Sequence, residues 1–217
     1  MDETIRNIAV YALPVLFAIT LHEAAHAYAA KYFGDNTAYS QGRMSLNPLV
    51  HVDIWGTIVI PIMMYLFTPF VFGYAKPVPV EFGRLRNPKR DMAWVALAGP
   101  IANLIMAALW LLFAALLVFF GVSEAFPRRM AQAGIVTNLL IMAFNLLPIP
   151  PLDGGRVVTS MLPHSLAYKF ARIEPYGFFI VLALVFLKVV GFWVIPVMSI
   201  GETLVRLVAS PFTFFLL

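Results

Sequence analysis

Several apolar runs, each about long enough to cross a lipid bilayer, restrict the fold of this chain more than any other feature. A helix needs about 20 mostly apolar residues to cross roughly 30 Å of hydrocarbon. Such runs lie at about 7–31, 92–120, 131–148, 174–190 and 192–209. Of the 217 residues, 61% are hydrophobic and 12% are charged, a balance far more apolar than that of a soluble domain. We therefore expect an all-α polytopic membrane protein with about five transmembrane helices.

A further apolar run at 54–72 is ambiguous. A straight spanning helix would have to absorb Pro61 and Pro69, and Gly73 follows directly. Irregular backbone at membrane depth is tolerated where it lies against protein or a water-filled cavity. We expect 54–72 to be a re-entrant or interfacial segment. Because no Gly/Ser-rich linker or internal repeat divides the chain, we expect residues 1–217 to form a single membrane-embedded domain.

The first apolar run contains an ionisable pentapeptide, HEAAH, at residues 22–26. Residues four apart lie on one face of a helix, so His22 and His26 can point their imidazoles at one ion, with Glu23 beside them. This is the H-E-x-x-H pattern of zinc peptidases, in which the glutamate acts as general base towards a zinc-activated water. The alternative is two histidines bonded to neighbouring helices and a solvated glutamate. Because ionisable groups at membrane depth are costly, the functional interpretation is favoured.

A third metal ligand must come from elsewhere, since a catalytic zinc site normally has three protein ligands and a water. The chain has no cysteine, which excludes thiolate ligands. Among the aspartates, only Asp153 lies in a largely apolar, proline-structured segment, NLLPIPPLDGGRV at 145–157. The prolines exclude a regular helix there and Gly154-Gly155 permits tight turns, so the segment can aim a carboxylate inward. A helix N-cap for residues 154–162 is the alternative role of Asp153, and it is compatible with ligation.

Three motifs together resemble the site-2 protease family of intramembrane zinc metalloproteases. They are HEAAH in the first membrane helix, AGPIAN at 98–103 in a later one, and NLLPIPPLDGG at 145–155, in the family's order. The resemblance implies that His22, His26 and Asp153 bind one zinc ion per chain and that Glu23 is the general base. It implies that Asn145 stabilises the oxyanion or positions the substrate, although an amide capping the broken helix is the alternative. It also implies a compact family member without a PDZ or CBS domain.

The metal ligands restrict the topology, because HEAAH and Asp153 must lie at the same depth. An even number of crossings must therefore separate the end of the first helix from the end of the run 131–148. If 54–72 spanned the membrane the number would be odd, so this segment should enter and leave by one face. Lys and Arg are more numerous on the active-site face under either arrangement. We expect a multi-pass protein of the cell membrane, with the N-terminus outside and the active site towards the cytoplasmic face.

The stretches on either side of the ambiguous run, 40–49 and 73–82, alternate weakly and carry residues that strands tolerate. In the resembled family a membrane-associated β-hairpin lies here and can pair with the unwound substrate. A helical peptide hides its amides, so an exposed strand edge suits that task. We expect a short membrane-associated β-hairpin, on weak support from the sequence itself.

For the other polar and small residues, a structural role is set beside a functional one. His51 has either a structural or interfacial role or a contact to substrate or metal, which it could share with Asp53 only from an irregular loop. His164 is expected in an exposed loop. Gly99, Pro100 and Asn103 are expected to allow close packing against the catalytic helix, with Asn103 hydrogen-bonding across helices; a direct catalytic role for them is the alternative.

The predicted function is hydrolysis of peptide bonds in or near transmembrane segments of membrane proteins, with Glu23 acting on a zinc-activated water. The expected partners are a transmembrane protein substrate and membrane lipid. The basic residues lack the aromatic interleaving of nucleic-acid binding surfaces. A non-hydrolytic metal transporter or sensor with the same ligands is the alternative, and a catalytically dead scaffold is a third. A transporter should carry further carboxylates or histidines along a path, and 92–120 and 174–187 contain none except Glu174 at one margin.

Overall fold

The computed structural model describes residues 3–60, 63 and 76–216, and this part of the chain is helical, without a strand. The expected all-α class is thereby confirmed. The long helices are α1 (Glu3–Tyr32), α4 (Pro88–Phe119), α5 (Ala125–Asn145) and α9 (Gly191–Leu216). The shorter ones are α2 (Thr37–Ser40), α6 (Asp153–Met161), α7 (His164–Ala171) and α8 (Glu174–Phe186). Single turns η1 (Pro48–Val50), η2 (Ile54–Val59) and η3 (Phe82–Arg84) lie between α2 and α4.

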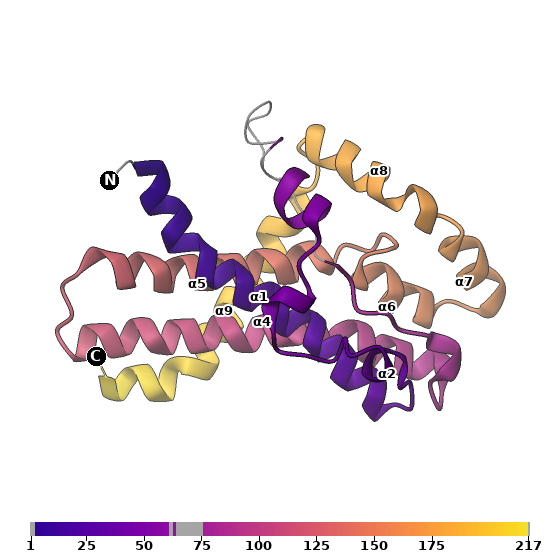
Figure 1. Ribbon diagram of the computed structural model, residues 1–217, viewed down its shortest axis with the longest axis horizontal. Helices are drawn as coiled ribbons and strands as arrows, with labels where there is room; N and C mark the ends of the chain where they lie inside the picture. The colour runs from indigo at the N-terminus through magenta and orange to yellow at the C-terminus, as the bar shows by residue number, and fades with distance from the viewer. Residues whose placement is uncertain (1–2, 61–62, 64–75, 217) are drawn as a thin grey trace.

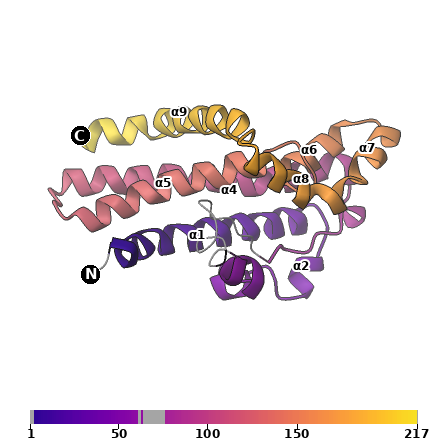
Figure 2. The same ribbon diagram turned by 90° about the horizontal axis from the view of Figure 1, so that it is seen from above.

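The long helices form a layered bundle (Figures 1 and 2). The middle layer is the antiparallel pair α4 and α5, with α1 on one side of it and α9 on the other. Both chain termini lie at one end of the bundle, together with the loop between α4 and α5. The short helices α2, α6 and α7 lie at the opposite end. The bundle therefore has two chemically distinct ends, which we call the terminal end and the short-helix end.

Small residues allow α1 to pack closely in this bundle. Ala18, Ala24, Ala27 and Ala30 are all at most 2% exposed. Without large side chains between them, helix backbones can approach closely, which is how helices associate where hydrophobic exclusion from water is weak. Helices α4, α5 and α9 form a separate apolar core on the side of the bundle away from α1. Its buried residues are Ala107, Leu139, Met142 and Val205.

Within the residues that the structure describes, three helical stretches are long and apolar enough to cross a membrane: Ile5–Tyr32, Pro88–Phe119 and Gly191–Phe212. The expected count of about five is not confirmed. Helix α8 has 13 residues, which at 1.5 Å per residue reach about 20 Å, less than the hydrocarbon thickness. Helix α5 has 21 residues and carries Arg128 and Arg129 near its start.

The connection between α1 and α4 is irregular but anchored. Asp35 is 1% exposed, and its carboxylate accepts hydrogen bonds from the Thr37 backbone amide at 2.9 Å and from the Glu81 amide at 2.7 Å. These two bonds fix the chain after α1 to the chain before α4. Neither 40–49 nor 76–82 forms a strand, so the expected β-hairpin is not confirmed; 73–75 lie outside the described residues. The run 54–72 begins with the π-helical turn η2, and most of the remainder, with its predicted re-entry, also lies outside them.

The proline-structured segment interrupts the helices as predicted. Helix α5 ends at Asn145 and α6 begins at Asp153. The two glycines after Asp153 have a different role from the one expected, because they are helical and neither has a positive φ. A Cβ atom at Gly154 would collide with the carbonyl of Leu146, and one at Gly155 with the backbone of Ile149. The glycines therefore bring the first turn of α6 against the broken segment, which holds Asp153 in place.

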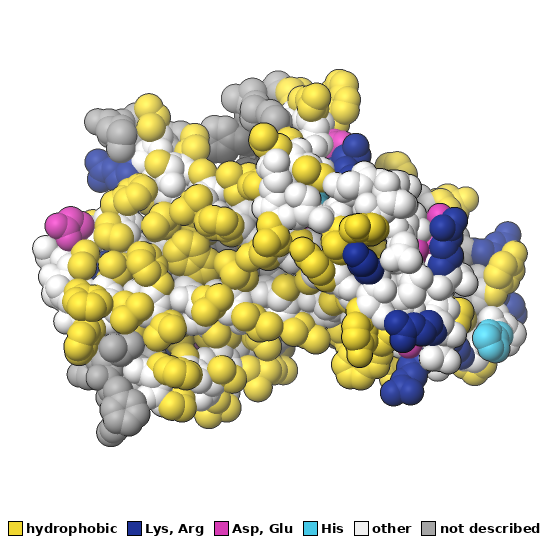
Figure 3. All heavy atoms as spheres, turned by 60° about the horizontal axis from the view of Figure 1, so that its bottom comes forward, with side chains coloured by type: hydrophobic (Ala, Val, Ile, Leu, Met, Phe, Trp, Pro, Cys, Tyr) yellow, Lys and Arg dark blue, Asp and Glu magenta, His cyan; other side chains and the backbone are white. Residues whose placement is uncertain are grey.

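The surface separates by chemistry along the bundle (Figure 3). A broad apolar belt covers its length from the terminal end, and Lys and Arg side chains gather at the short-helix end. That end carries basic residues of η3, the start of α4, α7 and the adjoining loops, among them Arg84, Arg86, Arg90, Lys169 and Arg172. An apolar belt of this kind is the surface expected of a bundle that crosses a membrane.

Candidate metal centre

The imidazoles of His22 and His26 meet on one face of α1. Their Nε2 atoms lie 3.1 Å apart, and the side chains are buried, at 5% and 8% exposure. One helical turn separates the two residues, so this approach follows from the spacing in the sequence.

Asp153, the first residue of α6, completes the cluster. Its Oδ2 atom lies 3.2 Å from Nε2 of His22 and 3.3 Å from Nε2 of His26. The carboxylate is buried, and Oδ2 accepts no well-directed hydrogen bond. Within the described part of the chain these three residues form the cluster with metal-binding geometry. The structure thus brings together the three predicted ligands from α1 and α6.

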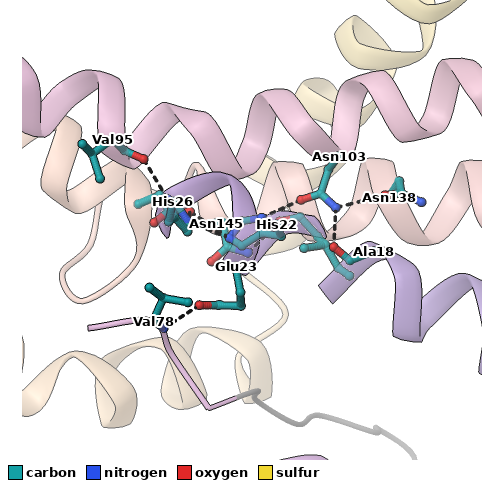
Figure 4. Close-up of polar contacts among 11 residues, drawn as sticks. Ala18, His22, Glu23, His26, Val78, Val95, Asn103, Asn138 and Asn145 are labelled. Carbon is teal, nitrogen blue, oxygen red and sulfur yellow. Dashed lines mark hydrogen bonds and ion pairs between the residues drawn. The ribbon is translucent and has the colours of Figure 1, made fainter. Parts of the chain in front are cut away.

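The outer nitrogens of both imidazoles are hydrogen-bonded to acceptors on α4 (Figure 4). Nδ1 of His22 lies 2.6 Å from Oδ1 of Asn103, and Nδ1 of His26 lies 2.7 Å from the carbonyl oxygen of Val95. A carbonyl can only accept, so Nδ1 of His26 carries a proton. The Asn103 amide nitrogen donates to Ala18 O at 3.2 Å and to Asn138 Oδ1 at 3.0 Å, which leaves its Oδ1 as the acceptor for His22.

This arrangement of protons suits a bound cation. With the proton of each neutral imidazole on Nδ1, both Nε2 atoms present lone pairs to each other and to the Asp153 carboxylate. Three lone pairs then converge with no proton between them. Nitrogen and oxygen ligands about 2.0–2.2 Å from one tetrahedral zinc ion lie roughly 3.3 Å from each other. The measured separations of 3.1, 3.2 and 3.3 Å match that spacing.

Gly99 of α4 lies against the ligand atoms. A Cβ atom at this position would lie 2.6 Å from Cε1 and 2.7 Å from Nε2 of His22, and would collide with Nε2 of His26. Real Cβ contacts are not this short, so a side chain here would displace the imidazoles. Val95, Gly99 and Asn103 are spaced four residues apart and form one stripe of α4 that faces the histidines.

Glu23 lies beside this centre, and its carboxylate is turned towards the segment before η3 (Figure 4). Its Oε2 accepts a hydrogen bond of 2.8 Å from the backbone amide of Val78. The side chain is half-buried, in contrast to the buried histidines on either side of it. An acidic group is thus held close to the ligand cluster but outside it.

Comparison with known proteins identifies the family. The model of "Peptidase family M50" matches residues 121–188. "Putative zinc metalloprotease YwhC" of Bacillus subtilis is 36% identical over 207 residues, which cover 92% of this chain and 91% of that protein. "Putative zinc metalloprotease Rip2" of Mycolicibacterium smegmatis is 29% identical over 82% of this chain and 67% of its own length. "Zinc metalloprotease MJ0392" of Methanocaldococcus jannaschii is 24% identical over 74% of this chain and 36% of its own length. No solved structure matches the chain.

The chain belongs to peptidase family M50. It is a metalloprotease of the site-2 protease type, as the order of its three motifs indicated. The M50 match covers α5, the broken segment and α6 to α8, and so includes Asp153 and Asn145 but not His22 or His26.

Asn145 is the last residue of α5 in this M50 peptidase. Its amide nitrogen donates to the Ile141 carbonyl at 3.0 Å, within its own helix. The bond lies at the end of α5, where the sequence left open either an amide that caps the broken helix or a role towards the substrate.

The remaining polar residues lie apart from the ligand cluster. His51 is 1% exposed, its Nε2 lies 2.8 Å from Ser45 O, and its carbonyl accepts from the Lys76 amide at 2.9 Å. Asp53 caps η2 by accepting from the Gly56 amide. His164 is exposed, as expected, but begins α7 instead of lying in a loop. The predicted bond of Asn103 across helices is confirmed.

Two groups at the M50 centre were missed in the sequence. The first is the Val95 carbonyl, whose spacing of four residues from Gly99 was the available signal. The second is the Val78 amide, which lies 55 residues from Glu23 along the chain. No local pattern connects such a pair, although the alternating prolines around Val78 mark an extended segment.

Proposed function

We propose that this chain is an intramembrane zinc metalloendopeptidase that hydrolyses peptide bonds in or near transmembrane segments of membrane proteins. The observation that carries the proposal is the convergence of His22, His26 and Asp153 inside a helical bundle with an apolar belt, directly beside Glu23. The relatives named as zinc metalloproteases support zinc as the metal, and one ion per chain fits the three ligands. Zinc held there supplies Lewis acidity towards a water and towards the scissile carbonyl.

The residues around the three metal ligands have separate roles in this proposal. Glu23 takes the proton of the attacking water and returns it to the leaving amine. Asn145 exchanges its hydrogen bond to the Ile141 carbonyl for one to the oxyanion of the substrate. Asn103 and Val95 keep the protons of the two imidazoles on Nδ1, so that both Nε2 atoms remain ligands.

The proposed topology places the short-helix end at the cytoplasmic face of the cell membrane. Helices α1, α4, α5 and α9 run along the bundle, with α8 as a shorter fifth apolar helix. Both termini then lie outside, since they share the terminal end. The gathering of Lys and Arg at the short-helix end supports this orientation. Membrane lipid covers the apolar belt, and the substrate reaches the centre from within the membrane.

The decisive experiment measures zinc content and cleavage of a generic transmembrane substrate by the purified protein in detergent. Glu23→Gln should retain zinc and lose cleavage by at least about 100-fold, because it removes a general base. His22→Ala and Asp153→Ala should lose both. Glu124→Gln is the matched control, since Glu124 is exposed and its side chain makes no capping bond.

Two outcomes would contradict the proposal. Cleavage by Glu23→Gln at the wild-type rate would exclude Glu23 as the base. Stoichiometric zinc in a wild-type protein that cleaves none of several transmembrane substrates would favour the metal transporter or sensor.

A further inference from the structure

An extended segment, residues 76–80, contacts α1 next to the proposed base. Val78 is 6% exposed and packs against Ala27 of α1 and Ala38 of α2. Its amide donates to Oε2 of Glu23 at 2.8 Å (Figure 4). The backbone of this segment is thus in direct contact with the carboxylate that the proposed mechanism uses.

The sequence of the segment, KPVPV, directs a single donor at Glu23. Pro77 and Pro79 have no amide hydrogen, so Val78 carries the one N–H group in the three-residue stretch 77–79. A residue before proline is restricted to extended backbone, and both Lys76 and Val78 precede a proline. The segment is therefore stiff, and the direction of the Val78 amide is largely set by its neighbours.

Arg43 holds this segment from the other side. Its Nη2 donates to the Lys76 carbonyl at 2.9 Å and to the Pro77 carbonyl at 3.3 Å. The Lys76 amide in turn donates to the carbonyl of His51 at 2.9 Å. Arg43 is only 9% exposed, which is unusual for a charged side chain, and within the described residues it forms no salt bridge with a carboxylate. Burying a guanidinium to bind two backbone carbonyls indicates that the position of those carbonyls matters.

We propose that Arg43 and residues 76–80 form a positioning clamp for Glu23. The clamp holds Oε2 through the Val78 amide and thereby orients the carboxylate, so that its other oxygen takes the proton. Arg43 acts through the segment and is a positioning residue, not a catalytic one. The inference rests on the proposed role of Glu23 as general base.

Val78→Pro tests the clamp most directly, because it removes the donor while the extended backbone is kept. Its matched control is Val78→Ala, which loses most of the side-chain packing but keeps the N–H group. We expect Val78→Pro to lower kcat by about 10–100-fold, the effect of one hydrogen bond to a charged group. KM should change by less than about threefold and zinc content should stay at the wild-type level, whereas Val78→Ala should keep kcat within about threefold.

Arg43 provides a second, independent variant pair. Arg43→Gln should lower kcat in the same way as Val78→Pro, and Arg43→Lys should restore part of it, because a lysine can still donate to the two carbonyls. A purely structural role would instead reduce folded protein or zinc content in step with activity.

A readout without catalysis is hydrogen exchange of the Val78 amide. We expect this amide to be protected in the wild type and in Glu23→Gln, whose side-chain carbonyl still accepts, and to exchange faster in Glu23→Ala.

The outcomes separate this inference from the proposed function. Loss of cleavage in Glu23→Gln together with wild-type kcat in Val78→Pro and Arg43→Gln would overturn the clamp alone. A higher kcat in Val78→Pro would also overturn it, because the segment would then be an inhibitory contact. Full activity of Glu23→Gln would overturn the proposed function, and the clamp with it.

Discussion

Replacement of Asn103 tests whether the hydrogen bond behind His22 determines metal affinity. Asn103→Ala removes the Oδ1 acceptor that lies 2.6 Å from Nδ1 of His22, at a position with 0% exposure. A buried donor left without a partner costs about 1–3 kcal/mol. In the metal-free protein His22 can avoid this cost by moving its proton to Nε2 or by rotating. In the metal-bound protein it cannot, because Nε2 must present its lone pair.

The cost therefore appears as lost affinity. At about 1.4 kcal/mol per tenfold change, it corresponds to roughly 5–150-fold weaker zinc binding, in line with the 10–100-fold typical of such outer contacts. The assay is competition for zinc between the protein in detergent and a chromophoric chelator of known affinity.

Two further variants test whether the missing acceptor for Nδ1 of His22 causes the loss of zinc affinity. Asn103→Asp keeps an acceptor for Nδ1 and should bind zinc within about threefold of wild type, although it loses the donor to Ala18 O and should be less stable. Asn138→Ala removes a neighbour of Asn103 but leaves the bond to His22, so its affinity should also change little. Wild-type affinity in Asn103→Ala, or equal losses in Asn103→Ala and Asn138→Ala, would refute the reasoning.

Two other predictions concern the centre as a whole. Gly99→Ala should abolish stoichiometric zinc binding, because its Cβ would occupy the space of the imidazoles; Gly83→Ala, where no atom lies within 4 Å, is the control, and zinc binding equal in both would contradict the packing. Removal of zinc by a chelator should lower the thermal unfolding midpoint in wild type, since a ligand at 100 times its Kd stabilises the folded state by about 2.7 kcal/mol. The same treatment should leave the midpoint of Asp153→Ala unchanged, and an equal shift in both would show that the chelator acts elsewhere.

The sequence was sufficient to find the ligands because their arrangement depends on local geometry. His22 and His26 are related by one helical turn, and Asp153 was conspicuous as a carboxylate in a proline-interrupted apolar segment. Asn103 was predicted to bond across helices, and it does. What the sequence could not supply was the identity of its partner, since the contact between His22 and Asn103 joins residues 81 positions apart.

Helix lengths were harder to predict than helix existence. The run 131–148 began after Arg128 and Arg129, but α5 starts at Ala125, because arginines near a helix end can reach the aqueous boundary. At its other end the apolar run continued past Asn145, where the prolines end the helix. The run 174–190 predicted a spanning helix, and α8 ends at Phe186. Hydropathy shows that a segment is buried in lipid or in protein, but it does not show where its helix ends. The ends of a helix depend on prolines and on capping residues.

The surface through which α1 packs against α4 also carries the two histidines and their hydrogen-bond partners. The stripe of α1 that carries His22 and His26 also carries Ala18 and Ala30, which are fully buried. The facing stripe of α4 presents a glycine, a carbonyl and an asparagine amide in place of large side chains. Close approach of the two helices is therefore what brings Nδ1 of each histidine to its acceptor. A side chain that separates α1 from α4 by even one methyl group would disturb the ligands first, which is why the smallest residue lies directly opposite the two Nε2 atoms.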